Sequence, residues 1–149
     1  MALAAEVEAF LAASMVARVA TRSPRGRPFV TPLWFVASGG RLYLATGRGT
    51  RAARNASRDP HVVLLLDGEL AKGARRVLRV RGTATVHDGM PPLHVLLLLA
   101  RKYYLTIDAL ASELRHAAQW ALRLRYYAQS TAAYLEIVPE SAELLAAPG

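Results

Sequence analysis

The residues from Ala45 to Asn55 have the types and the spacing of an anion-binding site. They read Ala-Thr-Gly-Arg-Gly-Thr-Arg-Ala-Ala-Arg-Asn, where an apolar stretch ends, two glycines follow and a helical pattern begins. The first amides of a helix have no intrahelical acceptor, and with the helix dipole they attract negative charge. Hydroxyl donors, a guanidinium that can hold two phosphate oxygens, and glycines that let an anion approach the backbone complete such a site. These residues are Thr46, Gly47, Gly49, Thr50 and Arg51.

Two other interpretations fit the same stretch. It can be an ordinary glycine turn followed by a solvated helix face, because Arg51, Arg54 and Arg58 share one side of the predicted helix. It also matches the dinucleotide pattern Gly-x-Gly-x-x-Ala, with Asp67 20 positions after Gly47. We reject the dinucleotide site because Asp59-Pro60 closes the helix early, a hairpin precedes it and no second β-α-β half follows.

The charge of the chain is concentrated in one third of the sequence. Between Ala9 and Arg58 there are nine arginines and no acidic residue, whereas the remainder after Arg58 has ten basic and nine acidic residues. A surface of one sign attracts anions, which are nucleic acid, an acidic membrane surface or a phosphorylated small molecule. The arginines fall across predicted strands and turns without a nucleic-acid-reading motif, so we expect a small-molecule partner and no nucleic acid.

Several kinds of chemistry are excluded by composition. The 149 residues include no cysteine, and the four histidines have no metal-ligand spacing, so we expect no metal site. The N-terminal ten residues contain two glutamates and no basic residue, which is the wrong charge for a targeting peptide. The longest apolar run, Val95–Ala100, is too short to span a membrane. We therefore expect a cytoplasmic protein without a membrane segment.

The elements that must hold the site are mainly short strands. The pattern predicts helices at Ala2–Ser14, Thr50–Arg58, Pro91–Tyr104 and Thr106–Tyr127, and strands at Met15–Thr21, Phe29–Val36, Arg41–Thr46, His61–Asp67, Val77–His87 and Thr131–Val138, the last ended by Pro139. Strands that follow one another as hairpins favour an antiparallel sheet or small barrel with attached helices. No repeat or linker divides the chain, so we expect one mainly β, α+β domain over residues 1–149.

Several segments of the sequence, in this order and spacing, are similar to one known family. They are Gly26–Phe35 (Gly-Arg-Pro-Phe-Val-Thr-Pro-Leu-Trp-Phe), Arg41–Arg51, Ala53–Asn55, Arg58–Val62, Val80–Ala84 and Leu135–Glu140. The chain resembles the pyridoxamine 5′-phosphate oxidase-like split-barrel flavoproteins, well from Val16 to Val86 and more loosely in the last strand. The resemblance implies a six-stranded antiparallel split β-barrel, here with a helical insertion, Pro91–Tyr127, before the last strand.

The resemblance also implies a homodimer with the cofactor at its interface. The cofactor is FMN, or in some branches the 8-hydroxy-5-deazaflavin coenzyme, and a few members bind haem. Carried over to this sequence, Thr46, Thr50 and Arg51 hold the phosphate, and the backbone of Val30–Trp34 lies along the flavin ring. The complete set of cofactor-binding residues that we predict is Val30, Thr31, Pro32, Leu33, Trp34, Thr46, Gly47, Arg48, Gly49, Thr50, Arg51 and Arg54.

Three departures argue against pyridoxamine phosphate oxidation itself. An arginine of the vitamin B6 oxidases is replaced by Thr31, and the lysine that follows the Thr-Arg pair is replaced by Ala52, leaving Arg48 or Arg54 to substitute. The C-terminal substrate-binding pattern has no counterpart in residues 131–149. We therefore expect a flavin-dependent oxidoreductase that transfers a hydride to or from an unknown small substrate. The alternatives are a deazaflavin-dependent reductase of the same fold and a non-enzymatic flavin- or haem-binding module.

Overall fold

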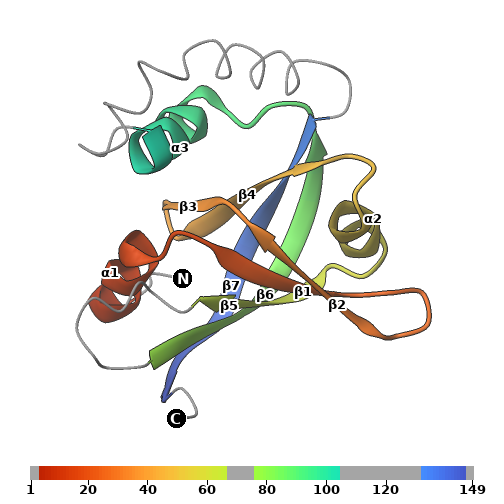
Figure 1. The fold of residues 1–149 in the computed structure, drawn as a ribbon, viewed down its shortest axis with the longest axis horizontal. Coiled ribbons are helices and arrows are strands. Elements are labelled where there is room, and N and C mark those ends of the chain that lie inside the picture. Colours follow the sequence, from red (N-terminus) through yellow and green to blue (C-terminus); the bar gives the residue numbers. More distant parts are fainter. Residues whose placement is uncertain (1–3, 67–75, 105–131, 147–149) are drawn as a thin grey trace.

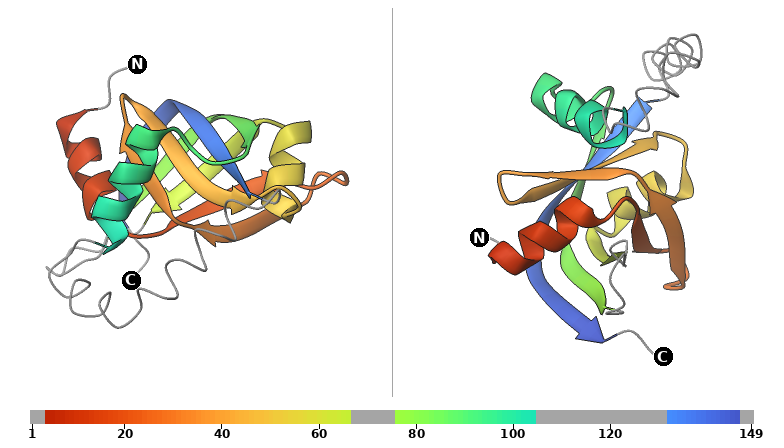
Figure 2. Two further views of the ribbon diagram at one scale, coloured as in Figure 1. Left: turned by 90° about the horizontal axis from the view of Figure 1, so that it is seen from above. Right: turned by 60° about the vertical axis from the view of Figure 1, so that its left-hand side comes forward.

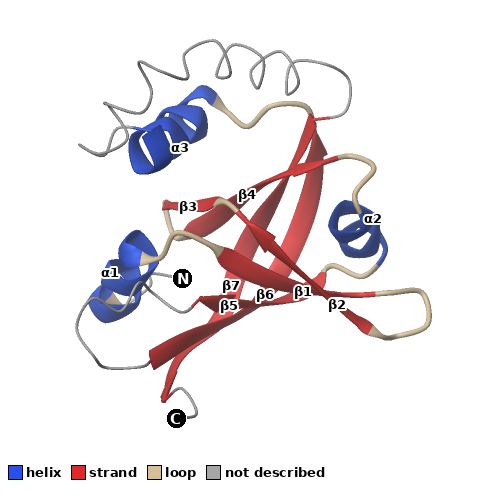
Figure 3. Ribbon diagram, viewed as in Figure 1, coloured by secondary structure: helices blue, strands red, loops and turns tan. Residues whose placement is uncertain are grey.

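The computed structural model describes residues 4–66, 76–104 and 132–146. In chain order the described elements are α1 (Ala5–Ala13), β1 (Ala17–Arg22), β2 (Pro28–Leu33), β3 (Phe35–Ser38), β4 (Arg41–Gly47), α2 (Arg51–Arg58), β5 (His61–Leu66), β6 (Arg76–Asp88), α3 (Leu93–Tyr104) and β7 (Ala132–Ala146). The helices lie around the margins of a curled sheet (Figure 3). The expected class, mainly β with attached helices, is confirmed.

The strands form one antiparallel sheet in the order β2-β1-β5-β6-β7-β4-β3. β2 and β3 are separated in the sequence by Trp34 alone, yet they lie at opposite edges of this sheet. The chain therefore closes the sheet upon itself at Trp34, where the Ala45 amide donates to the Trp34 carbonyl over 3.1 Å. The result is the curled half-barrel of Figures 1 and 2, as expected for a split barrel.

The sheet has seven described strands where six were expected. The single strand predicted over Phe29–Val36 is divided at Trp34, because its first part pairs with β1 and its second part with β4. The alternation of burial also breaks there, since Phe35 and Val36 are buried one after the other. A strand that changes partner at the seam of a barrel no longer has the period of two that identifies it in the sequence.

The last strand runs through Pro139, so the prediction that Pro139 ends it is wrong. Gly82 of β6 faces Pro139 while Arg81 faces Ser141, so that Glu140 is the extra residue of a β-bulge. A proline lacks the amide that a regular ladder needs, and a bulge accommodates it. The strands are so close at this point that a Cβ on Gly82 would lie 2.6 Å from the Val138 carbonyl oxygen.

Apolar side chains fill the concave side of the sheet. The largest fully buried ones are Phe35, Leu11, Leu42, Leu44, Leu64, Leu66, Leu78, Leu135 and Ile137. A second cluster covers the opposite face of β3, β4 and β7, where Val95, Leu98 and Leu99 of α3 pack against Val36, Tyr43 and Tyr134. These two clusters fix α1 and α3 against the sheet from which the candidate site projects.

α3 begins after Pro91-Pro92, as predicted, with the Val95 and Leu96 amides donating to the Pro92 carbonyl. The helix predicted over Thr106–Tyr127 lies outside the described residues, and so does Asp67. Within the described part of the chain, no helix is long and apolar enough to cross a membrane.

Candidate functional site

The loop from β4 to α2 is closed by the two threonines of the predicted phosphate site. Thr50 is the N-cap of α2, since its hydroxyl accepts from the Ala53 amide over 3.2 Å and donates to the Gly47 carbonyl over 2.8 Å. The Thr46 and Thr50 hydroxyl oxygens are 2.9 Å apart. Because Thr50 has one proton and gives it to Gly47, Thr46 is the donor in this contact. Both hydroxyl protons are therefore used inside the loop.

The donors that this loop leaves for an anion are backbone amides. Among the described residues, the amides of Gly49, Arg51 and Ala52 have no intramolecular acceptor. Gly49 is exposed, and no heavy atom lies within 4 Å of the position that a Cβ would take there. The glycine thus leaves open space beside the start of α2, where the helix dipole favours negative charge.

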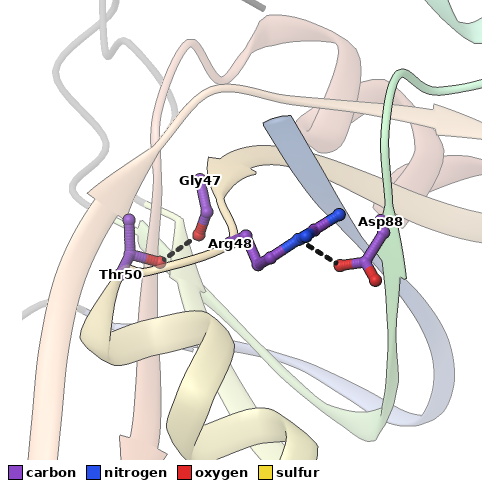
Figure 4. A network of polar contacts seen from close by, with 4 residues as sticks. All are labelled: Gly47, Arg48, Thr50 and Asp88. Atoms are coloured by element: carbon purple, nitrogen blue, oxygen red, sulfur yellow. Dashed lines mark hydrogen bonds and ion pairs between the residues drawn. The ribbon is translucent and has the colours of Figure 1, made fainter. Parts of the chain in front are cut away.

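Arg48 is directed away from this helix start. Its Nε lies 3.0 Å from Oδ1 of Asp88 at the end of β6, and both side chains are more than half exposed. Figure 4 shows Arg48 extending toward Asp88 while Thr50 turns back to Gly47. An exposed pair of this kind contributes at most about 1 kcal/mol, so a ligand that competes for Arg48 displaces little.

A basic groove of about 560 Å³ lies between α2 and the hairpin that joins β1 to β2. The groove is lined by Ser23, Pro24, Arg27, Pro28, Phe29, Arg51, Arg54, Asn55 and Arg58, with no acidic residue among them. The Arg51 guanidinium lies over the Phe29 ring, 5.2 Å from its centroid. Four guanidinium groups with no carboxylate partner among the residues that the structure describes favour binding of an anion.

α2 is anchored beneath the groove by a buried polar pair. The Asn55 side chain is 4% exposed, and its amide donates to the Thr21 hydroxyl over 3.1 Å. Thr21 is itself buried in β1. This bond joins the helix that carries Arg51, Arg54 and Arg58 to the sheet, so it fixes one wall of the groove relative to the other.

Four of the predicted ring-binding residues, Val30–Leu33, lie on β2 at one edge of the described sheet, and the fifth, Trp34, follows directly. Along this strand Pro28, Val30 and Pro32 are exposed, while Phe29, Thr31 and Leu33 are half-buried. Val30 has 54% of its surface exposed and Trp34 has 39%. β2 pairs with β1 alone among the described strands, which leaves an apolar edge directly beside the groove.

The structure therefore brings Arg51 and Arg54 together in the groove. Thr46, Gly47, Gly49 and Thr50 lie in the loop that leads into α2 and are not among the groove residues, and Arg48 pairs with Asp88 instead. Sequence reasoning missed Arg27 and Arg58 as groove residues. The spacing of Arg51, Arg54 and Arg58 on one helix face was a signal for Arg58, but a hairpin turn gives no such signal for Arg27. In the described part of the chain, no group of three or more histidine, aspartate or glutamate side chains is arranged to hold a metal ion.

Comparisons with known proteins agree with this fold. A family model described as pyridoxamine 5′-phosphate oxidase matches residues 3–126. A conserved hypothetical protein from Mycobacterium tuberculosis is 20% identical, with a TM-score of 0.69 over 98% of this chain and 86% of that chain. The heme storage protein HutZ from Vibrio cholerae is 21% identical, with a TM-score of 0.65 over 98% and 95% of the two chains.

A structure named as an F420 reductase is 19% identical, with a TM-score of 0.63 over 91% of this chain and 94% of that chain. A comparison with curated proteins found no match. At these identities the solved structures share the fold, whereas the family model spans most of the sequence. The chain belongs to the pyridoxamine 5′-phosphate oxidase family.

Proposed function

We propose that the protein is a flavin-dependent oxidoreductase that binds FMN with its phosphate at the end of the basic groove where Arg51 begins α2. The observation that carries the proposal is the set of four guanidinium groups that line the groove, with no acidic residue in its lining and with Arg51 at the start of α2. A phosphate monoester carries a charge of about −1.5 to −2 at neutral pH and offers three acceptor oxygens. Arg51, Arg54 and the amides at the start of α2 are donors of the kind that it requires.

The flavin ring is proposed to lie along Val30–Trp34. The half-buried and exposed residues of β2 supply an apolar surface next to the groove, with Val30 54% exposed. Flat apolar rings bind on such surfaces when a few polar groups fix their orientation. The ring supplies the hydride chemistry, and the residues of the chain hold it and exclude water.

The edge of the sheet formed by β2 is proposed to be part of a homodimer interface. Val16, Val30 and Trp34 are exposed apolar residues near one edge of the described sheet. A second copy would cover this surface and enclose the ring. Sedimentation of the purified protein tests this proposal, which predicts a dimer, and a monomer at micromolar concentration would contradict it.

The cofactor is tested by the absorption spectrum and mass of whatever copurifies with the protein, followed by titration of the apoprotein with FMN and with the deazaflavin coenzyme. We expect FMN binding in the micromolar range or tighter, and oxidation of reduced nicotinamide in the presence of an acceptor. Binding of the deazaflavin coenzyme without binding of FMN would favour the alternative, a deazaflavin-dependent reductase. A Soret band with no flavin binding would favour a haem-binding module, and no binding of any of these would exclude the proposal.

A further inference from the structure

The seam of the half-barrel at Trp34 is held by a residue from α3. Trp34 is the only residue between β2 and β3, so its placement determines how the chain passes from one edge of the sheet to the other. The Tyr103 ring stacks on the Trp34 ring, with the centroids 4.5 Å apart and the planes 8° from parallel. Such a stacked pair contributes beyond the area that it buries.

The Tyr103 hydroxyl joins the backbone that follows Trp34 to the backbone that precedes β1. It accepts from the Phe35 amide over 2.9 Å, at the first residue of β3. It lies 2.7 Å from the Met15 carbonyl and 3.1 Å from the Phe35 carbonyl. Because the hydroxyl has a single proton, it donates to the nearer carbonyl, that of Met15. One hydroxyl thus fixes the approach to β1 and the start of β3.

Lys102 attaches the same turn of α3 to the seam. Its Nζ lies 3.6 Å from the centroid of the Phe35 ring and 3.4 Å from the Leu11 carbonyl oxygen. Burial raises the pKa of the Tyr103 hydroxyl, so the proton that it donates stays in place at neutral pH. The end of α3 therefore contacts α1, the approach to β1 and the seam together.

We propose that Tyr103 is a positioning residue for the ring-binding segment, holding Trp34 and the seam in the place that the flavin ring requires. The inference rests on the proposed function, because it assigns Tyr103 to the ring part of that site. It also gives a role in the site to α3, which is the first part of the helical insertion. The phosphate end of the site, by contrast, is held by α2 and does not depend on Tyr103.

Binding of FMN and of riboflavin distinguishes the ring part of the site from its phosphate end, because the two ligands share the ring and only FMN has the phosphate. We would measure both affinities for the wild type, Tyr103→Phe and Tyr103→Leu. Tyr103→Leu should weaken FMN and riboflavin by the same factor, about tenfold, since hydrogen bonds and stacking at the ring segment are lost. Tyr103→Phe keeps the stack and loses the hydroxyl, so a smaller loss, again equal for the two ligands, is expected.

Two further measurements separate positioning from a general loss of structure. Tyr134→Phe is the matched control, because Tyr134 is a buried tyrosine that packs with Val95 and Leu98 of α3 in the cluster on the opposite face of the sheet, away from Trp34. It should leave both affinities unchanged. In a Trp120→Phe background, emission reports Trp34 alone, since the chain has two tryptophans. Tyr103→Leu should make that emission more accessible to acrylamide.

The outcomes are distinguishable. If the wild type binds neither flavin, the proposed function and this inference both fail. If the wild type binds both but the Tyr103 variants bind them equally well, or if Tyr134→Phe loses as much, the inference alone is overturned. A loss confined to FMN would also overturn it, because that pattern belongs to the phosphate end. If Tyr103→Leu does not fold, Tyr103→Phe decides by the same criteria.

Discussion

Eight of the arginines that the structure describes form two groups with opposite surroundings. In the groove, the guanidinium groups have no carboxylate within 4.0 Å among the described residues; these are Arg27, Arg51, Arg54 and Arg58. On and around the long β6–β7 ladder, each arginine of the second group has a carboxylate partner. The pairs are Arg76 with Glu6, Arg79 with Glu143, Arg41 with Glu136, and Arg48 with Asp88.

The difference separates charge that belongs to the fold from charge that is available to a ligand. Arginines that have carboxylate partners join neighbouring elements and add little stability, because they are largely exposed. Clustered arginines without partners repel one another, which is a cost that an anion removes on binding. A total charge of +8 does not show this, because it sums both groups.

Removal of Arg51 should have the largest effect on FMN affinity. Arg51 stands at the start of α2 and lines the groove, so Arg51→Ala should weaken FMN by roughly 1.5–3 kcal/mol, about 10- to 150-fold. Isothermal titration measures this loss. The thermal midpoint should hardly change, and a variant that binds FMN like the wild type would remove Arg51 from the site.

Removal of Arg27 or Arg58, which line the groove but do not lie at the start of α2, should have a smaller effect on FMN affinity. Arg27→Gln and Arg58→Gln should each weaken FMN binding by about three- to tenfold, because these exposed charges do not lie at the start of α2, where the phosphate is proposed to bind, and solvent and salt screen them. Arg25→Gln is the matched control, since Arg25 is exposed in the same hairpin turn but does not line the groove. Equal losses for Arg25 and Arg27 would show that the effect is a general one of net charge.

Lys102 is a cation of a third kind, half-buried with its ammonium over the Phe35 ring. Desolvation lowers its pKa from 10.5 to about 8. Between these values the unfolded chain keeps a proton that the folded chain has released, so the free energy of unfolding should rise with pH above about 8. The raised pKa values of Tyr43, Tyr103 and Tyr134 act in the opposite sense only above about pH 10, where unfolded tyrosines ionise.

The measurement is urea unfolding of the wild type and Lys102→Met at about pH 7.5 and pH 9.5. The wild type should gain stability relative to the variant at the higher pH. A constant difference between the two proteins would show that the Lys102 ammonium is not desolvated.

The smallest effect is expected from a paired arginine. Arg79 Nη2 lies 2.8 Å from Glu143 Oε2, and both side chains are partly exposed. Arg79→Gln should lower the free energy of unfolding by at most about 1 kcal/mol and leave FMN affinity unchanged. A loss of FMN affinity here as large as that of Arg51→Ala would remove the distinction between the two groups.

Local patterns predicted most of the elements but not how the chain closes. Alternation and turn residues identified the strands, and the paired prolines identified the start of α3. The division of one predicted strand at Trp34 was missed, because a change of hydrogen-bond partner depends on strands distant in the sequence. Pro139 was misjudged for the same reason, since the bulge that tolerates it depends on the register with β6.

The candidate site could be predicted where its residues are local. The stretch from Thr46 to Arg51 is continuous, and the start of α2 follows it directly, with Thr50 as the N-cap. Two facts did not follow from the sequence pattern. The threonine hydroxyls donate within the loop, and Arg27 reaches the groove from a hairpin that only the fold brings beside α2.

The central claim is that this groove binds the phosphate of a flavin, and one cycle of four titrations tests it most directly. FMN and riboflavin are titrated into the wild type and into Arg51→Ala. We predict that the wild type binds FMN at least tenfold more tightly than riboflavin and that Arg51→Ala loses most of this preference while its riboflavin affinity stays the same. Equal wild-type affinities for the two ligands, or a preference that survives the substitution, would contradict the account.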